Sequence, residues 1–166
     1  MTHVLVAYAS RRGATAEIAG WIGDALRDAG LDVDVREAAG VQRLDGYDAV
    51  VLGSAVYMGR WRRDARRFAR RHRRALFDRA VWLFSSGPLD HSADDGTLPS
   101  PAGVRRIAER IGARGDTVFG GALSPGTPGR LARGIAAQQG GDYRSRAAIR
   151  QWSEMVAADL AAERLA

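Results

Sequence analysis

Residues 4 to 15, Val-Leu-Val-Ala-Tyr-Ala-Ser-Arg-Arg-Gly-Ala-Thr, decide how the rest of the chain is interpreted. The apolar run ends at Tyr8 and gives way to small and hydroxyl residues, and from Ile18 onward apolar residues recur at helical spacing. This pattern predicts a strand, a turn and a helix. Hydroxyls, a glycine and the free N–H groups of a helix N-terminus suit a phosphate, because the helix end carries partial positive charge. The alternative is an ordinary turn in which Thr15 or Ser10 caps the helix.

Two more apolar runs end in loops of the same kind. The run at 49–52 is followed by small residues and one aromatic: Gly53, Ser54, Ala55, Val56, Tyr57, Met58 and Gly59. The run at 80–84 is followed by a second such loop: Ser85, Ser86, Gly87, Pro88, Leu89 and Asp90. Parallel strands direct their carboxyl ends to one edge of a sheet, so three such loops predict a common ligand site at that edge.

The other segments complete an alternation of strands and helices. The spacing of apolar residues predicts further strands at 31–36 and 117–123, and helices at 61–77, 102–111, 131–137 and from 147 onward. Gly30 is expected to end the first helix as a C-cap glycine. Buried strands that alternate with helices indicate an α/β protein with a parallel sheet covered on both faces. We expect one domain over the 166 residues, since no repeat or linker is apparent.

The composition excludes several kinds of site. The chain has no cysteine, which excludes disulfides, thiol catalysis and thiolate metal sites. Residues 1–9 lack the basic and apolar regions of a signal peptide, and no apolar run is long enough to span a bilayer. We therefore expect a cytoplasmic protein. Asp90, Asp94 and Asp95 do not have the spacing of a calcium loop, and we expect no metal site.

The charge is unusual, because all basic residues other than histidine are arginine and the formal net charge is +6. Eight arginines fall on the polar face of the helix predicted at 61–77. A solvated face whose long stems cover apolar surface is the interpretation we favour. The alternative is a docking patch for an anionic partner.

The chain resembles the flavodoxin-domain family over nearly its whole length. Residues 10–15 resemble the family's phosphate loop, of the form Ser/Thr-x-x-Gly-x-Thr, and the loops at 53–59 and 85–89 resemble its two flavin loops. Within the family, the chain is most similar to the menaquinone-dependent protoporphyrinogen dehydrogenase group. That similarity rests on residues 121–123 and 140–142, followed by a last helix that contains a tryptophan.

The resemblance implies a flavodoxin-like three-layer sandwich with five parallel strands in the order 2-1-3-4-5, and one non-covalent FMN. The phosphate is then bound by Ser10, Arg11, Arg12, Gly13, Ala14 and Thr15. The flavin ring is expected between the loops 54–59 and 85–90, with Tyr57 as the stacking ring and Trp61 as the alternative. His91 is the histidine nearest to the implied ring, where it either gates a proton or is a loop residue without a role.

Three functions follow from the resemblance and stay open at this point. The first is an FMN-dependent oxidoreductase related to protoporphyrinogen dehydrogenase, which takes an anionic tetrapyrrole and passes electrons to a quinone. The second is a non-enzymatic electron carrier that docks on an acidic reductase, and the third is a deazaflavin-binding protein. Two arginines in the phosphate loop and a positive net charge depart from the usually acidic carriers. The charge also suits peripheral contact with an anionic membrane, whereas a nucleic-acid partner is not expected.

Overall fold

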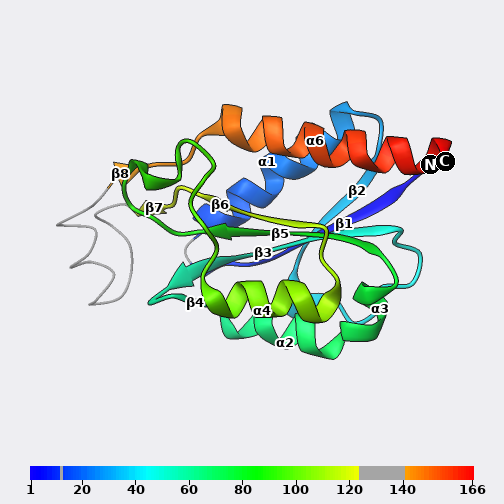
Figure 1. The fold of residues 1–166 in the computed structure, drawn as a ribbon, viewed down its shortest axis with the longest axis horizontal. Coiled ribbons are helices and arrows are strands. Elements are labelled where there is room, and N and C mark those ends of the chain that lie inside the picture. The colour runs from blue at the N-terminus through cyan, green and yellow to red at the C-terminus, as the bar shows by residue number, and fades with distance from the viewer. Residues whose placement is uncertain (12, 124–140) are drawn as a thin grey trace.

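A computed structural model describes residues 1–11, 13–123 and 141–166, and Figure 1 shows a sheet between two layers of helices. The five parallel strands are β1 (His3–Ala9), β2 (Asp32–Glu37), β3 (Ala49–Tyr57), β5 (Ala80–Ser86) and β6 (Gly115–Phe119). Their order is β2-β1-β3-β5-β6, and the short strand β4 (Arg60–Trp61) pairs antiparallel with β3. When only the parallel strands are numbered, this is the predicted order 2-1-3-4-5, which is confirmed.

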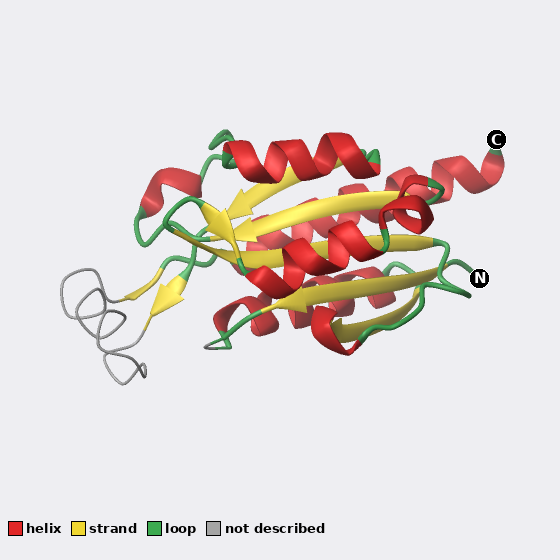
Figure 2. Cartoon of the chain, turned by 90° about the horizontal axis from the view of Figure 1, so that it is seen from below, coloured by secondary structure: helices red, strands yellow, loops and turns green. Residues whose placement is uncertain are grey.

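The helices cover the sheet from both sides, as Figures 1 and 2 show. One face carries α1 (Ala14–Asp28) and α6 (Arg146–Leu165), and the other carries α2 (Arg63–Arg71), α3 (Arg73–Phe77) and α4 (Ala102–Ile111). Two short 3-10 turns, η1 (Ala38–Gly40) and η2 (His91–Ala93), lie in the connections. A separate two-stranded antiparallel sheet joins β7 (Ala122–Leu123) to β8 (Gly141–Asp142).

The central strands are apolar on both faces because each face has a helical layer to pack against. On one side, Ile22 of α1 and Val156 of α6 belong to the same buried cluster as Val51. On the other, Phe68 of α2 and Val104 of α4 belong to a second cluster. Burial of each such side chain contributes about 1.5–3 kcal/mol to folding, so the two cores hold the carboxyl edge of the sheet in place.

Helix α1 ends as predicted. Gly30 has a φ of 91°, in the left-handed region that glycine tolerates. The N–H of Leu31 donates to the carbonyl of Leu26 at 3.1 Å, the long hydrogen bond of a Schellman ending. The chain then enters β2 alongside β1. None of the helices in the described ranges is long and apolar enough to cross a membrane.

The prediction of one helix over 61–77 is wrong. Trp61 lies in β4, α2 begins only at Arg63, and His72, with φ −102° and ψ 19°, separates α2 from α3. Trp61 shares the helical spacing because its ring is buried in the same core as Phe68, although it reaches that core from a strand. The helix predicted at 131–137 lies outside the described residues.

The prediction of a loop from Gly53 onward is also wrong. Strand β3 continues to Tyr57, because it pairs with β5 up to Ala55 and with β4 beyond that point. Met58 and Gly59 form the two-residue turn of this hairpin, with φ of 51° and 77°. Two successive positive φ values are the signature of a type I′ turn, which suits the twist of paired strands.

Candidate functional site

The three predicted loops leave the sheet along one line. Ala9 of β1 is in register with Ser54 of β3, and Ser54 is in register with Ser85 of β5. In Figure 1 these strand ends lie at the same side of the molecule as β4 and β7. The prediction that the loops meet at one edge of the sheet is therefore confirmed.

The first loop leads into α1 without a side-chain cap. Gly13 occupies the N-cap position with φ 91° and ψ −20°, and its N–H donates to the Ser10 hydroxyl at 3.1 Å. Thr15, which is 2% exposed, lies in the first helical turn. Neither hydroxyl caps the helix, so the capping alternative is wrong. The first-turn N–H groups have no acceptors within the helix, which leaves them for an anion. Arg11 is exposed, and Arg12 lies outside the described residues.

The β3–β4 hairpin forms the second part of the edge. The Ser54 hydroxyl is buried and accepts the N–H of Arg62 at 2.9 Å, so its side chain is already engaged. Side chains alternate along a strand. Val56 packs on the core beneath α2 and α4, and Tyr57 projects away from that core with 48% of its surface exposed. Met58 and Gly59 form the exposed tip, and Ala55 is half-buried.

Trp61 is not available as the alternative stacking ring. Its ring is 2% exposed, and its Nε1 donates to the Ser85 hydroxyl at 2.8 Å inside the protein. Tyr57 is consequently the one ring on this hairpin with a free face.

The third loop is held by backbone hydrogen bonds. Ser85 and Ser86 are buried within β5, so Gly87 is the first loop residue. Its N–H donates to the carbonyl of Phe119 at 3.2 Å, and the Pro88 carbonyl accepts the N–H of Gly121 at 2.9 Å. A Cβ placed on Gly87 would lie 3.3 Å from the Cβ of Val56, so the second and third loops touch.

Two polar side chains near the end of this loop are already engaged. The carboxylate of Asp90 accepts the N–H of Ser92 at 2.8 Å, and hydrogen bonding from Ser92 lowers the pKa of Asp90. His91 is 78% exposed at its side chain and contacts Asp94 through Nδ1 at 2.8 Å. The proton-gating role of His91 stays a prediction. No group of three or more His, Cys, Asp or Glu side chains in the described ranges is arranged to hold a metal.

The segment around β7 and β8 borders the same edge, which the sequence indicated only in part. Gly120 leaves no room for a Cβ because the carbonyl of Tyr143 lies there. The N–H of Tyr143 donates to Gly121 at 3.0 Å, and its ring meets that of His91 edge-on with 5.2 Å between centroids. Glycine at this position is therefore required by the close approach of Tyr143.

Arg144 joins the same segment to the start of α1. Its side chain is 10% exposed and forms ion pairs with Asp142 at 2.8 Å and Glu17 at 3.5 Å. Its Nη1 donates to the carbonyl of Ala14 at 3.4 Å, and the guanidinium lies over the Trp21 ring at 4.7 Å. No local motif marks Arg144, because its partners are distant in sequence.

Comparison with known proteins identifies the family. A family model described as a flavodoxin domain matches residues 5–124, more than half of the chain. The chain belongs to the flavodoxin-domain family. No curated protein is similar enough to count as a match.

Solved structures agree with this flavodoxin fold. A flavodoxin from Streptococcus pneumoniae is 20% identical with a TM-score of 0.61, over 95% of this chain and 99% of that one. Flavodoxin 2 from Bacillus cereus is 22% identical with a TM-score of 0.58, over 82% and 94%. Rubredoxin oxygen:oxidoreductase from Desulfovibrio gigas is 12% identical with a TM-score of 0.69, and this chain spans 38% of its length.

Membership of the flavodoxin-domain family implies FMN as the cofactor, and the edge of the sheet fits it. The uncapped N-terminus of α1 suits a phosphate, and nothing lies within 4 Å of the position where Gly13 would carry a Cβ. The exposed face of Tyr57 and the backbone of the loop from Gly87 suit an aromatic ring with polar edges.

Proposed function

We propose that this flavodoxin-domain protein holds FMN where β1, β3 and β5 end and exchanges electrons with a protein partner. The observation that carries the proposal is the register of Ala9, Ser54 and Ser85, which brings the three loops to one edge. When bound there, FMN supplies the redox chemistry, and the protein binds and orients it.

Each loop has a task in this proposal. The N–H groups that follow Gly13 and the Thr15 hydroxyl bind the phosphate, and the positive end of α1 balances its charge. Tyr57 covers one side of the ring. The backbone of Leu89 and Asp90 donates to and accepts from the polar edge of the ring, because Ser85 and Ser86 are buried in β5 and the Gly87 N–H and the Pro88 carbonyl bond to Phe119 and Gly121.

A protein partner is favoured by the position of the hairpin tip. Tyr57 and Met58 are exposed large side chains at the proposed ring edge. Arg60 comes after Gly59 and pairs with Tyr57 across the hairpin. A partner that contacts this tip therefore meets both an aromatic surface and positive charge, and both favour docking close to the ring.

Quinone-linked oxidation of an anionic tetrapyrrole is the second candidate. It is favoured by the two-stranded sheet of β7 and β8, which lies in the segments that resemble the protoporphyrinogen dehydrogenase group. Tyr143 follows β8 and contacts His91, just after the third loop. In that case this small sheet would form one wall for a substrate.

Electron transfer from the reduced, FMN-loaded protein to two purified acceptors tests the proposal. The two acceptors are native, basic cytochrome c and cytochrome c made acidic by succinylation of its lysines, which carry the same haem. We expect the acidic form to be reduced faster at low salt, with the difference shrinking as salt screens the charges. Equal rates with both acceptors at every salt concentration would contradict a charge-selected protein partner. Turnover of protoporphyrinogen with a soluble menaquinone analogue in the same preparation would favour the second candidate.

A further inference from the structure

The positive charge of the chain is concentrated on one face. Residues 60–74 contain nine arginines and one aspartate, and α4 contains three arginines and one glutamate. These two segments carry a net charge of +8 and +2, so the rest of the chain sums to −4 against the total of +6. Both segments lie on the face of the sheet opposite α1 and α6 (Figure 1).

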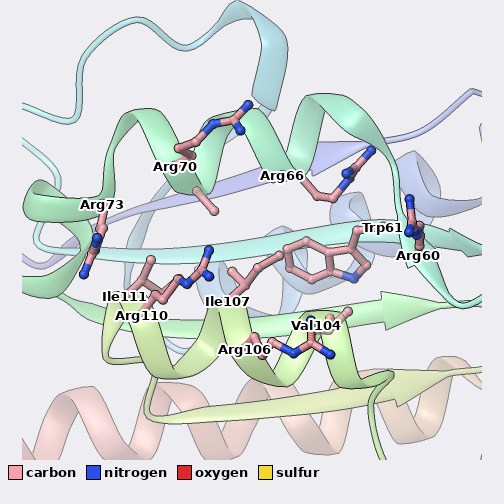
Figure 3. Close-up of a pocket in the computed structure, with 12 residues that line it drawn as sticks. Arg60, Trp61, Arg66, Arg70, Arg73, Val104, Arg106, Ile107, Arg110 and Ile111 are labelled. Atoms are coloured by element: carbon pink, nitrogen blue, oxygen red, sulfur yellow. The ribbon is translucent and has the colours of Figure 1, made fainter.

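A groove of about 480 Å³ runs between α2 and α4 on this face. Six arginines line it: Arg60, Arg66, Arg70, Arg73, Arg106 and Arg110. Figure 3 shows Arg66 and Arg70 on α2, and Arg106 and Arg110 on α4. Apolar side chains form its floor, with the half-buried Ile107 between the two rows.

The six arginines have no carboxylate partner in the described part of the chain. The arginines that form ion pairs there are Arg27, Arg43, Arg114, Arg144 and Arg150, all outside the groove. Residues 12 and 124–140 contain no aspartate or glutamate, so their side chains supply no carboxylate either. Unpaired like charges around one groove repel each other, and an anionic occupant relieves that repulsion.

We infer that this groove docks an acidic segment of the redox partner, with carboxylates toward the two arginine rows and apolar side chains toward Ile107. The inference rests on the proposed function for the identity of the partner as a redox protein. Arginine suits this occupant because its planar group donates two parallel hydrogen bonds to a carboxylate.

The position of the groove supports a role in electron transfer. One end lies at Arg60 and Trp61, on the strand that forms the hairpin with Tyr57 (Figure 3). The other end lies at Arg73, where α3 begins. A segment seated between α2 and α4 therefore holds its protein beside the tip of the hairpin, next to the proposed flavin edge.

The shape of this face favours an acidic polypeptide over an anionic bilayer or a nucleic-acid duplex. A bilayer surface is flat and cannot reach the floor between two helices. A duplex offers phosphates on a polar backbone and gains nothing from an aliphatic side chain such as Ile107. A helix or extended segment supplies both carboxylates and apolar groups at spacings that two rows can meet.

Two double variants with the same charge change test the groove. The groove variant, Arg66→Glu with Arg106→Glu, alters two residues that line the groove. The neighbour variant, Arg67→Glu with Arg105→Glu, alters two exposed residues on the same helices, and neither of these lines the groove. The probe is a labelled helical peptide of about 15 residues, with Glu and Leu on separate faces, and binding is measured by fluorescence anisotropy at low salt. The same peptide with Gln for Glu is the control for charge.

We expect the groove variant to weaken peptide binding roughly tenfold or more and the neighbour variant less than about threefold, because only the former removes direct contacts. Equal weakening by both variants, no binding of the Glu peptide, or equal binding of the Gln peptide would overturn the inference. Tighter binding of a short DNA duplex or of phosphatidylglycerol vesicles, reduced equally in both variants, would overturn it in favour of those partners. FMN content is measured by absorbance in each sample, which separates failure of the groove from failure of the cofactor site.

Discussion

The phosphate loop can be tested by placing the same strain at each end of one helix. Gly13 and Gly30 flank α1, both have a φ of 91°, and nothing lies within 4 Å of the Cβ that either would carry. Alanine at either position therefore meets no steric clash, and its only cost is the left-handed backbone conformation. That conformation costs a residue with a Cβ about 1–2 kcal/mol.

This cost is expected to lower FMN affinity in one variant and folding stability in the other. At Gly30 the hydrogen bonds from Gly30 to Arg27 and from Leu31 to Leu26 hold the left-handed conformation. Gly13 lies in the loop that precedes α1, and in Gly13→Ala we expect the free protein to relax this loop out of that conformation. FMN must then restore that conformation on binding. A penalty of about 1–2 kcal/mol raises the dissociation constant of FMN about five- to thirty-fold. Gly30→Ala lies at the far end of α1 and is expected to lose a similar amount of folding stability with FMN affinity unchanged.

The assay is a titration of FMN fluorescence quenching in both variants, together with urea unfolding to measure stability. Riboflavin, which lacks the phosphate, serves as the second ligand, and its affinity is expected to be the same in both. If Gly13→Ala and Gly30→Ala bind FMN equally well, the assignment of the phosphate to the start of α1 is refuted.

Three further predictions follow from single contacts. Thr15→Val is expected to weaken FMN by about 1–3 kcal/mol, because the bound phosphate loses a hydroxyl donor; an unchanged affinity in the same titration would count against that contact. Burial lowers the pKa of His72 below its ordinary value of 6.5. As pH falls below about 6.5, the unfolded chain takes up a proton that the folded chain does not, so folding stability falls. In His72→Phe the melting temperature is expected to change less with pH between pH 7.5 and the lowered pKa of His72. If it falls with pH as steeply as in the unaltered protein, His72 is excluded as the cause. A Cβ on Gly53 would collide with the ring of Phe84, so Gly53→Ala is expected to lose about 1–3 kcal/mol in urea unfolding, whereas Gly40→Ala, which has open space, is not; equal midpoints would contradict this packing.

The architecture was predictable because it depends on long, regular signals. The apolar runs at 49–52 and 80–84 could be buried only in a sheet covered on both faces, and each is followed by small residues. Helix α4 runs over the predicted residues 102–111. These signals were sufficient to bring the three loops to one edge.

The hairpin of β3 and β4 could not be predicted from local signals. Its turn has Met58 at a φ of 51°, where asparagine or glycine is the usual signature. Trp61 has the spacing of a helical core residue although it lies in a strand. Arg144 lies beside the start of α1 through contacts with Glu17 and Ala14, and no spacing rule reports contacts between residues so far apart in the chain.

The most direct test of the account compares the affinities of the purified protein for FMN and for riboflavin. Binding is measured by the change in flavin absorbance and fluorescence. Two charge-assisted hydrogen bonds from the start of α1 contribute about 1.5–3 kcal/mol each. The account therefore predicts that FMN binds at least about 100-fold more tightly than riboflavin, with a stoichiometry of about one. Equal affinities, or a protein that takes up neither flavin, would contradict the claim that the edge of β1, β3 and β5 is an FMN site.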